Sequence, residues 1–578
     1  MVKQRDPRFY NSDLPEKIDL PEVPIGNMIQ GAATKYGDRT ALIFHEASIS
    51  FKQLYEESLK LANALNKLGY GKGDVITVYL PNSIQYVIAY YGIALSGATY
   101  SAANPFAHVP DVVYQMKHTE TKAVIAHTIC AQNLVDVAEK IGLRDVIVTG
   151  PEEIDGINGF TDAAKFHPYW HSFNALKSQE EAKPLHIEIA PKEQIASIAF
   201  TGGTTGYAKG VLNTHYNFVS NCLVSSASQG MLPSLDSEGG LTVKAYTDDS
   251  KFEEEYAIVP GKSITMSPAP LYHISGLMGS VGVGTVQGNT LILIDQFHPK
   301  TFIENIEKYK VTQISGAPSL YNVLLTIPQL YETDVSSVRN IGSGAAPMSA
   351  EIQRRLLEVF THSIISDGYG LTEATGACIQ TVAFKSGVRK LGSIGLPVYN
   401  TEVKIAPVDE SSDEEMPTGE KGELLIKGPQ IAKGYYKAEE DTLSTFVDGW
   451  LRTGDVAVRD EDGILTIVDR KKDMLIYNGY NIYPRQIEEI IYEHEAVQSC
   501  VIIGIPDDVV GDRMKAFVVL KPNATETVED VLEYVNSRVV HYSKVREIEE
   551  LEQLPMTASG KISRIALQKM ITKEGDRV

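Results

Sequence analysis

One stretch carries most of the structural information in this 578-residue chain: Ile195-Ala196-Ser197-Ile198-Ala199-Phe200, followed directly by Thr201-Gly202-Gly203-Thr204-Thr205-Gly206-Tyr207-Ala208-Lys209-Gly210. The first six residues form an apolar run of the length of a buried β-strand. The glycines that follow permit a sharp turn and a close approach to an anion. The hydroxyls, backbone N–H groups and lysine are donors suited to phosphate oxygens. No Gly-Lys-Ser/Thr ends the loop, so a phosphate-loop ATPase is disfavoured. Taken alone, the same residues also fit an ordinary Gly/Thr-rich turn.

Strand-like and helix-like segments alternate on both sides of this loop. The predicted strands are residues 75–80, 123–126, 145–148 and 290–294, and the predicted helices include residues 84–95, 300–310 and 350–360. Such alternation predicts βαβ units and mainly parallel sheets. Between about residues 392 and 468, short strands separated by Gly, Pro and Asp turns predict a β-rich subdomain. The sequence therefore predicts an α/β fold with a large N-terminal domain of α/β layers over residues 1–470.

A small α+β domain is predicted over residues 471–578. Pro484 suits a first helical turn, and Ile487, Ile490 and Ile491 follow at helical spacing. Residues 499–505 then predict a strand and residues 528–539 an amphipathic helix, in a module of ordinary domain size. The polar segment 234–262 interrupts the alternation of the large domain, and we interpret it as a solvated surface excursion.

Composition excludes several classes of protein. The net charge of −21 argues against nucleic-acid binding. Four well-separated cysteines without a CxxC pattern indicate reduced, packed thiols and a cytoplasmic protein. The N-terminus has no apolar signal core. The apolar window 274–294 is interrupted by Gly, Ser, Gln and Asn, so we expect a buried helix, turn and strand rather than a membrane span.

Four further motifs follow the Gly/Thr loop in a fixed order: Tyr369-Gly370-Leu371-Thr372-Glu373, then Gly449-Trp450-Leu451-Arg452-Thr453-Gly454-Asp455, then Asp469-Arg470-Lys471-Lys472-Asp473 running on to Gly479-Tyr480-Asn481-Ile482-Tyr483-Pro484, and finally Pro555-Met556-Thr557-Ala558-Ser559-Gly560-Lys561. Together the five motifs resemble those of the adenylate-forming superfamily of acyl-CoA synthetases, peptide-synthetase adenylation domains and luciferases. The resemblance extends from about Ile29 to Lys569. The family loop usually has serine at the position of Gly202 and proline at that of Ala208, but most of the donors are kept.

The resemblance implies two half-reactions. A carboxylate attacks the α-phosphate of ATP to give an acyl-adenylate and pyrophosphate, and a thiol, usually that of coenzyme A, then displaces AMP. The carboxylate is already ionised, so the enzyme must mainly position the reactants and stabilise charge. The residues implied to hold the β- and γ-phosphates are Thr201, Thr204, Thr205, Gly206 and Lys209. Glu373 would hold Mg²⁺ as a hard carboxylate ligand, and Thr372 would contact the α-phosphate.

The same resemblance assigns the rest of the nucleotide site. Asp455 would accept hydrogen bonds from the ribose, with Arg470 beside it. Tyr369 either stacks on adenine or is an ordinary core residue, and Asp367 would accept from the exocyclic amino group. The segment Gly344-Ala345-Ala346-Pro347 would lie against the base. Lys561 would be the catalytic lysine of adenylation, Lys472 the hinge for rotation of the small domain, and Gly479 with Tyr480 part of the coenzyme A tunnel.

The acyl side of the site begins at Pro268-Ala269-Pro270-Leu271-Tyr272-His273. This segment has no aspartate for an α-amino group, so an amino-acid substrate is disfavoured. His273 would gate the acyl pocket or orient the carboxylate, unless it is only structural. Gly276 and Gly279, with Gly282 and Gly284, either border a long apolar slot or permit tight packing.

We therefore predict an AMP-forming ligase that joins a medium- or long-chain fatty acid to coenzyme A. A ligase for an aromatic or short hydroxy acid, an enzyme that loads a carrier protein, and a nucleotide-binding regulator without activity stay as alternatives. The expected partners are ATP, a carboxylic acid and coenzyme A, with no nucleic acid and no transmembrane segment. The sequence leaves the chain length of the acid and the oligomeric state, monomer or homodimer, open.

Overall fold

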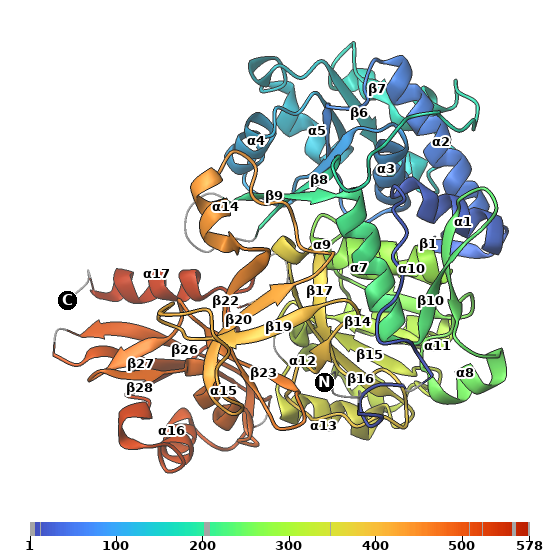
Figure 1. The fold of residues 1–578 in the computed structure, drawn as a ribbon. Helices are drawn as coiled ribbons and strands as arrows, with labels where there is room; N and C mark the ends of the chain where they lie inside the picture. The colour runs from blue at the N-terminus through green and yellow to red at the C-terminus, as the bar shows by residue number, and fades with distance from the viewer. Residues whose placement is uncertain are drawn as a thin grey trace.

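The fold was obtained as a computed structural model. It describes residues 6–11, 13–201, 208–346, 348–507, 509–522, 524–557 and 562–575. Figure 1 shows a large body formed by the N-terminal and central parts of the chain, with the C-terminal part, orange to red, at one side.

Two large sheets form the framework of this body. The seven-stranded sheet has the order β7 (His171–Ser172), β6 (Asp145–Thr149), β5 (Ala123–His127), β3 (Val75–Tyr79), β4 (Thr99–Ala102), β8 (Ile195–Phe200), β9 (Gly210–Thr214). The nine-stranded sheet has the order β18 (Leu396–Pro397), β17 (Gly376–Gln380), β16 (Ile364–Leu371), β15 (Asn340–Ser343), β14 (Gln313–Gly316), β12 (Ile264–Ser267), β13 (Thr290–Leu293), β1 (Thr40–Phe44), β2 (Ala47–Ser50). The central pairings of both sheets are parallel. Strand β9 at one edge of the seven-stranded sheet is antiparallel to its neighbour, as are the edge strands of the nine-stranded sheet, whereas β7 is parallel to β6.

Alternation of side chains along the strands produces the layers. On β5 and β6, Ile125 and Ile147 pack into a core shared with the other sheet, whereas Val124 and Val146 pack on the outer face. Because successive side chains of a strand point to opposite faces, apolar runs of this kind need helices on both sides. The result is a stack in which helices lie outside each sheet and also between the two.

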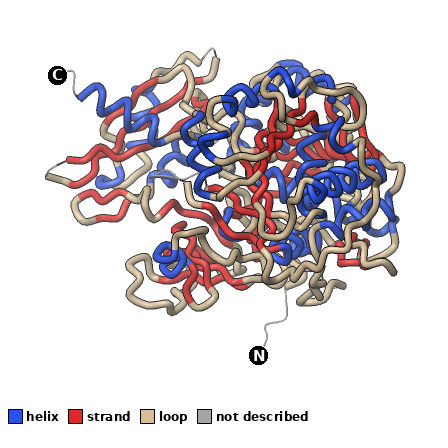
Figure 2. The backbone as a smooth tube through the Cα atoms, turned by 90° about the horizontal axis from the view of Figure 1, so that it is seen from above, coloured by secondary structure: helices blue, strands red, loops and turns tan. Residues whose placement is uncertain are grey.

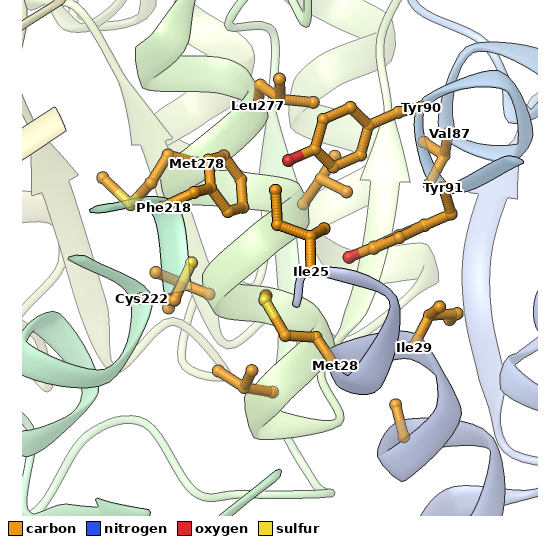
Figure 3. Packing of buried hydrophobic residues seen from close by; sticks show 14 of the residues in the cluster. Ile25, Met28, Ile29, Val87, Tyr90, Tyr91, Phe218, Cys222, Leu277 and Met278 are labelled. Carbon is orange, nitrogen blue, oxygen red and sulfur yellow. The ribbon is translucent and has the colours of Figure 1, made fainter. Parts of the chain in front are cut away.

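The shared core takes residues from α1 (Gly26–Tyr36), α2 (Phe51–Lys67), α3 (Ile84–Leu95), α7 (His215–Ser228) and α10 (Val283–Gln287). Figure 3 shows part of it, with Tyr90 and Phe218 side by side; their ring centroids are 5.5 Å apart. The outer helices are α4 (Val109–His118) and α5 (Thr128–Val135) on one sheet, and α11 (Pro299–Lys308), α12 (Pro318–Leu324) and α13 (Ala350–Val359) on the other.

The C-terminal third contains two smaller sheets. The first is formed by β19 (Glu402–Ala406), β20 (Lys421–Lys427), β22 (Trp450–Arg459), β21 (Phe446–Val447) and β23 (Leu465–Arg470). The second is formed by β25 (Tyr480–Ile482), β24 (Leu475–Tyr477), β27 (Gly511–Leu520), β26 (Val497–Asp507) and β28 (Glu547–Glu550), with helices α15 (Pro484–Tyr492), α16 (Val528–Asn536) and α17 (Arg564–Gly575). Seen from above, this last group projects from the main body (Figure 2). The predicted α/β class, the β-rich region and the small α+β unit are therefore confirmed.

One interpretation of the sequence is wrong. The segment 234–262 is not simply a solvated excursion, because it contains strand β11 (Leu241–Ala245), paired with β10 (Met231–Leu235), and helix α8 (Asp249–Glu255). Leu241 and Val243 of β11 are fully buried against the core. Contact with α1 is so close that a side chain at Gly31 would lie 2.4 Å from the backbone N of Leu241. The polar composition hid this short alternation of apolar residues.

The apolar window 274–294 folds as predicted, into a broken helix, a turn and strand β13. It consists of α9 (Ile274–Gly276), the π-helix η4 (Leu277–Gly282) and α10, and it ends at Gly288 with φ of 70°. Every helix in the described parts of the chain is too short or too polar to cross a lipid bilayer. The four cysteines are buried thiols.

Candidate active site

A cavity of about 1820 Å³ opens where β14, β15 and β16 end and where the C-terminal unit meets the large body. Ligand sites of open α/β sheets lie at the carboxyl ends of the strands, so its place fits the fold. Most of the described residues predicted for the site line it: Thr201, His273, Gly279, Gly344, Ala345, Ala346, Asp367, Tyr369, Thr372, Glu373, Asp455, Arg470 and Lys472. The described residues Lys209, Gly276, Gly479 and Tyr480 do not.

The Gly/Thr loop follows strand β8, as the sequence predicts, and leads into β9. Thr204, Thr205 and Gly206 lie outside the described residues. Thr201 and Lys209 are paired at the base of the loop, since the N–H of Thr201 donates to the carbonyl of Lys209 at 3.0 Å. The Lys209 ammonium lies 2.5 Å from a carboxylate oxygen of Asp441 and 5.0 Å from the ring centroid of Tyr435. Lys209 is thus held outside the cavity lining by an exposed ion pair.

The end of β16 brings Thr372 and Glu373 into the cavity. Thr372 begins a short 3₁₀ turn and is 7% exposed, while Glu373 is partly exposed. The hydroxyl of Tyr435 donates to Oε1 of Glu373 at 2.8 Å. This carboxylate also lies close enough to raise the pKa of Tyr435, to which burial contributes most. One oxygen of Glu373 is therefore positioned by a neutral donor.

Asp455 is the centre of a second group. The Tyr369 hydroxyl donates to its Oδ2 at 2.5 Å, and Nε of Arg470 lies 3.3 Å from its Oδ1. Asp455 and Arg470 are register partners on the antiparallel strands β22 and β23, so the sheet itself sets their spacing. Asp455 is 7% exposed, which makes it an oriented acceptor with a cation beside it.

The third group lies around the end of β15. Gly344, Ala345 and Ala346 follow this strand, and Ala345 has φ of 66°, a left-handed conformation that costs a non-glycine residue about 1–2 kcal/mol. Asp367, on the neighbouring strand β16, is 3% exposed, and Nε2 of Gln353 lies 3.4 Å from its Oδ2. Burial raises the pKa of Asp367 to about 7. The strained backbone at Ala345 and the raised pKa of Asp367 together indicate a functional region. Pro347 lies outside the described residues.

The C-terminal unit closes one side of the cavity. Thr557 and Ile562 line it, and Lys561, between them, lies outside the described residues. Helix α15 docks on strand β23, because the N–H of Arg485 donates to Oδ2 of Asp469 at 3.0 Å and its guanidinium donates to the carbonyl of Ile467 at 2.9 Å. Burial at this contact raises the pKa of Asp469 to about 6.

The predicted hinge and coenzyme A residues lie in different places. Lys472 is in the turn between β23 and β24, on the cavity wall. Tyr480 is 54% exposed and stacks on Tyr542 at a centroid distance of 4.4 Å, and Gly479 has open space beside it. These two residues are therefore not brought together with the nucleotide groups in this arrangement of the two units.

The broken helix over residues 274–287 forms the wall of a side channel. His273 precedes it, and its Nδ1 accepts the N–H of Ser275 at 3.3 Å. A side chain at Gly279 or Gly284 would meet nothing within 4 Å, so both glycines face open space. A side chain at Gly276 would lie 2.2 Å from the carbonyl oxygen of Pro270. Gly279 borders the channel, whereas Gly276 permits close packing.

Sequence reasoning did not find two elements of the site. Tyr435 follows Gly434, whose φ is 138°, and a Gly-Tyr-Tyr run in a β-rich region gives no sign that it faces Glu373. Arg485 and Asp469 are ordinary charged residues in the sequence, and only the docking of α15 on β23 makes them partners.

Comparisons with known proteins identify the family. A family model described as "AMP-binding enzyme" matches residues 29–436, and one described as "AMP-binding enzyme C-terminal domain" matches residues 486–561. The chain is 33% identical over 569 residues to a long-chain-fatty-acid–CoA ligase of Bacillus subtilis (strain 168), covering 96% of each. It is 31% identical to a long-chain-fatty-acid–CoA ligase of Salmonella typhimurium, covering 97% of each.

Among solved structures, the anthranilate CoA ligase AuaEII in complex with anthranoyl-AMP has a TM-score of 0.81 and 24% identity, covering 97% of this chain and 98% of that one. The fold is that of the adenylate-forming enzymes. The chain belongs to the AMP-binding enzyme family. The predicted membership of the adenylate-forming family is confirmed, and so is the predicted class of reaction, that of an AMP-forming acyl-CoA ligase.

Proposed function

We propose that the protein joins a medium- or long-chain fatty acid to coenzyme A through an acyl-adenylate, with the residue roles set out below. The observation that carries this proposal is the continuity of one cavity from Asp455 and Glu373 to the open space beside Gly279 and Gly284. A nucleotide and an extended acyl chain need such a two-part site, joined at the reacting carboxylate. The names of the relatives support an aliphatic acid.

For adenylation, the nucleotide is held by groups at the strand ends. Asp455 accepts from the ribose hydroxyls, because its side-chain oxygens lie beside Arg470 at the cavity wall and are acceptors. Asp367 and the segment Gly344–Ala346 take the adenine. Thr372 donates to the α-phosphate, and Thr201, Thr204, Thr205, Gly206 and Lys209 take the outer phosphates. Lys209 would exchange its exposed pair with Asp441 for a phosphate oxygen.

Glu373 suits Mg²⁺, since it is a hard oxygen ligand whose other oxygen is held by Tyr435. In the described parts of the chain no cluster of three metal-ligating side chains occurs. A single carboxylate fits an ion that keeps waters and substrate phosphates as its other ligands. When bound, the ion would neutralise charge on the phosphoryl oxygens; the protein's part is to hold Glu373 beside Thr372.

The acid would enter the channel past His273. In the tautomer in which Nδ1 accepts from Ser275, the proton is on Nε2, which would donate to the substrate carboxylate. Lys561 would stabilise the negative charge between this carboxylate and the α-phosphate. Its neighbours Thr557 and Ile562 on the cavity wall support this role in the present arrangement.

Thioester formation needs another arrangement of the C-terminal unit. We propose that it turns about Lys472 and brings Gly479 and Tyr480 to the channel by which the thiol enters. Gly479 has φ of 82° and no neighbour that a side chain would meet, so the strand turn there leaves room for a slender group.

The decisive experiment measures AMP and acyl-CoA together over saturated acids from C4 to C18, with ATP, Mg²⁺ and coenzyme A. Formation of both products, with a maximum at C8 or longer, is the expected result. A maximum with benzoate-like or short acids would replace the proposed substrate. Pyrophosphate exchange without a thioester would indicate a carrier protein as acceptor, and nucleotide binding without AMP release would refute the proposed activity.

A further inference from the structure

The inner end of the acyl channel is polar, which is unusual for a buried sheet face. Neutral polar side chains line it: Gln229, Thr265, Gln287, Asn289, Gln313 and Asn340. The charged residues that line the cavity lie elsewhere, around the nucleotide groups, on the C-terminal unit and at Asp111 on α4. An apolar tail would offer no partner to those polar atoms that do not already bond to one another, so the channel is not shaped for a plain hydrocarbon end.

Three of these residues form a row across the nine-stranded sheet. Thr265 of β12 is the register partner of Gln313 on β14, which is the partner of Asn340 on β15. On the opposite face of the same strands, Met266 and Ile314 are fully buried in apolar surroundings. The row therefore faces the side of the sheet on which the broken helix and the channel lie.

The row presents one donor and one acceptor. Thr265 donates to Oε1 of Gln313 at 3.1 Å, which directs the amide N–H groups of Gln313 away from it. Gln313 is partly exposed although it lies on a central strand, because it borders the cavity. Asn340 is 1% exposed and donates to Ser366 at 2.5 Å, while its Oδ1 has no hydrogen-bond partner among the described residues.

A second group of side chains at the inner end of the channel also contains a buried acceptor without a partner. The amide of Gln287 donates to Gln229 at 2.9 Å, and the amide of Asn289 donates to Gln287 at 2.8 Å. Oδ1 of Asn289 is then buried without a partner among the residues that the structure describes. Leaving a buried acceptor unsatisfied costs about 1–3 kcal/mol, so two such atoms on residues that line one channel require an explanation.

We propose that the natural substrate of this ligase carries a hydroxyl group on the inner part of its acyl chain, bound between Gln313 and Asn340. A hydroxyl is both a donor and an acceptor, so one group satisfies the Gln313 amide and the Asn340 oxygen. The absence of a charged side chain from the described lining of this end disfavours a second carboxylate. This inference rests on the proposed function, of which it specifies the substrate class.

The position of the hydroxyl follows from the strands. Asn340 begins β15, and Gly344, beside the nucleotide, comes four residues later. At roughly 3.3 Å per residue, Asn340 and Gly344 are about 13 Å apart along the strand. The hydroxyl would therefore lie well along a medium-length chain and not beside the reacting carboxylate.

The test compares kcat/KM for each saturated acid from C8 to C14 with that for its hydroxy acids, substituted from C6 to the terminal carbon. We expect at least a tenfold preference for one hydroxyl position. Gln313→Met and Asn340→Leu, which keep side-chain size, should each reduce the preference to twofold or less, mainly by impairing the hydroxy acid. The matched control Gln329→Met changes a glutamine outside the cavity, bonded to Glu304 at 3.3 Å, and should keep the preference.

An oxo acid offers only an acceptor, so its kcat/KM should be lower than that of the matching hydroxy acid. Gln313→Met should lower the kcat/KM for the oxo acid more than Asn340→Leu does. Equal or better use of unsubstituted acids by the wild-type enzyme overturns the inference and leaves the proposed function intact. A preference that survives both channel variants also overturns it. If no acid of either series yields AMP and acyl-CoA, the proposed function itself has failed. Melting temperatures of all variants identify any that have lost their fold.

Discussion

Gly279→Leu tests directly whether the broken helix borders an acyl channel. No atom lies within 4 Å of a side chain's first carbon at this position, and the backbone has an ordinary conformation for an L-residue. Leucine adds four carbon atoms to the channel. They would displace on the order of three to four substrate methylenes, each worth about 0.8 kcal/mol when buried. The loss of about 3 kcal/mol corresponds to a factor of roughly 100 in kcat/KM.

This loss should fall on long chains alone. Acids that end before Gly279 keep their contacts, so their kcat/KM should change by less than about twofold, and nucleotide affinity should not change. The assay is acyl-CoA formation over C4 to C16 acids, with the melting temperature of each variant measured beside it. Because leucine favours a helix by nearly 1 kcal/mol over glycine, the melting temperature should hold or rise slightly.

Gly276→Ala is the contrasting variant. Its added methyl group would lie 2.2 Å from the carbonyl oxygen of Pro270, so the backbone must move. We expect a lower melting temperature and equal impairment with every acid. A stable Gly279→Leu enzyme with an unchanged chain-length profile would refute the channel.

Four further predictions concern the nucleotide and the rotation of the C-terminal unit. Glu373→Gln should raise the Mg²⁺ concentration needed for half-maximal adenylation, and an unchanged requirement would make this carboxylate structural. Lys561→Ala should slow adenylation by about 10²–10³ and spare thioester formation from supplied acyl-adenylate; equal losses would contradict its role. Lys472→Pro should impair thioester formation more than pyrophosphate exchange, because proline fixes φ, unless the hinge lies elsewhere. Burial raises the pKa of Asp367 to about 7, and the ionised carboxylate is a stronger acceptor for the adenine amino group than the neutral acid. Nucleotide affinity should therefore fall as pH drops through 7. Calorimetry on Asp367→Asn, whose neutral amide oxygen accepts at every pH, should show a flatter profile, and an identical profile would exclude Asp367.

Sequence patterns predicted the parts of the fold that depend on local periodicity. The strand at residues 75–80 and the helix at residues 84–95 occur as β3 and α3 almost to the residue. Both are apolar runs bounded by turns. Their local sequence preference and their tertiary packing therefore favour the same structure. Strand β11 was missed because its apolar alternation is only Leu241 and Val243 within a polar segment.

The candidate site was predictable only as far as its motifs reach. Motifs identify Glu373, Asp455 and Tyr369, but they do not identify Tyr435, and they do not show that Tyr435 bonds to Glu373 or that Tyr369 bonds to Asp455, in both cases across more than 60 residues of chain. The glycines after His273 show the same limit. Gly276 and Gly279 are three residues apart and look alike in the sequence, yet one packs on a carbonyl and the other faces a channel.

In the proposed function, adenylation and thioester formation need different arrangements of the C-terminal unit. The contact by which this unit docks is compatible with a change between them. Thr557 and Ile562 line the cavity while Tyr480 faces solvent beside Tyr542, which is the arrangement that we propose for adenylation. The contact that holds it, Asp469 with Arg485, buries a carboxyl whose pKa is raised to about 6. At neutral pH the docked state must bury a mostly ionised group. A contact weakened in this way can still hold the unit for the first step and yet release it for the second, whereas an apolar interface of equal area would favour one arrangement too strongly for turnover.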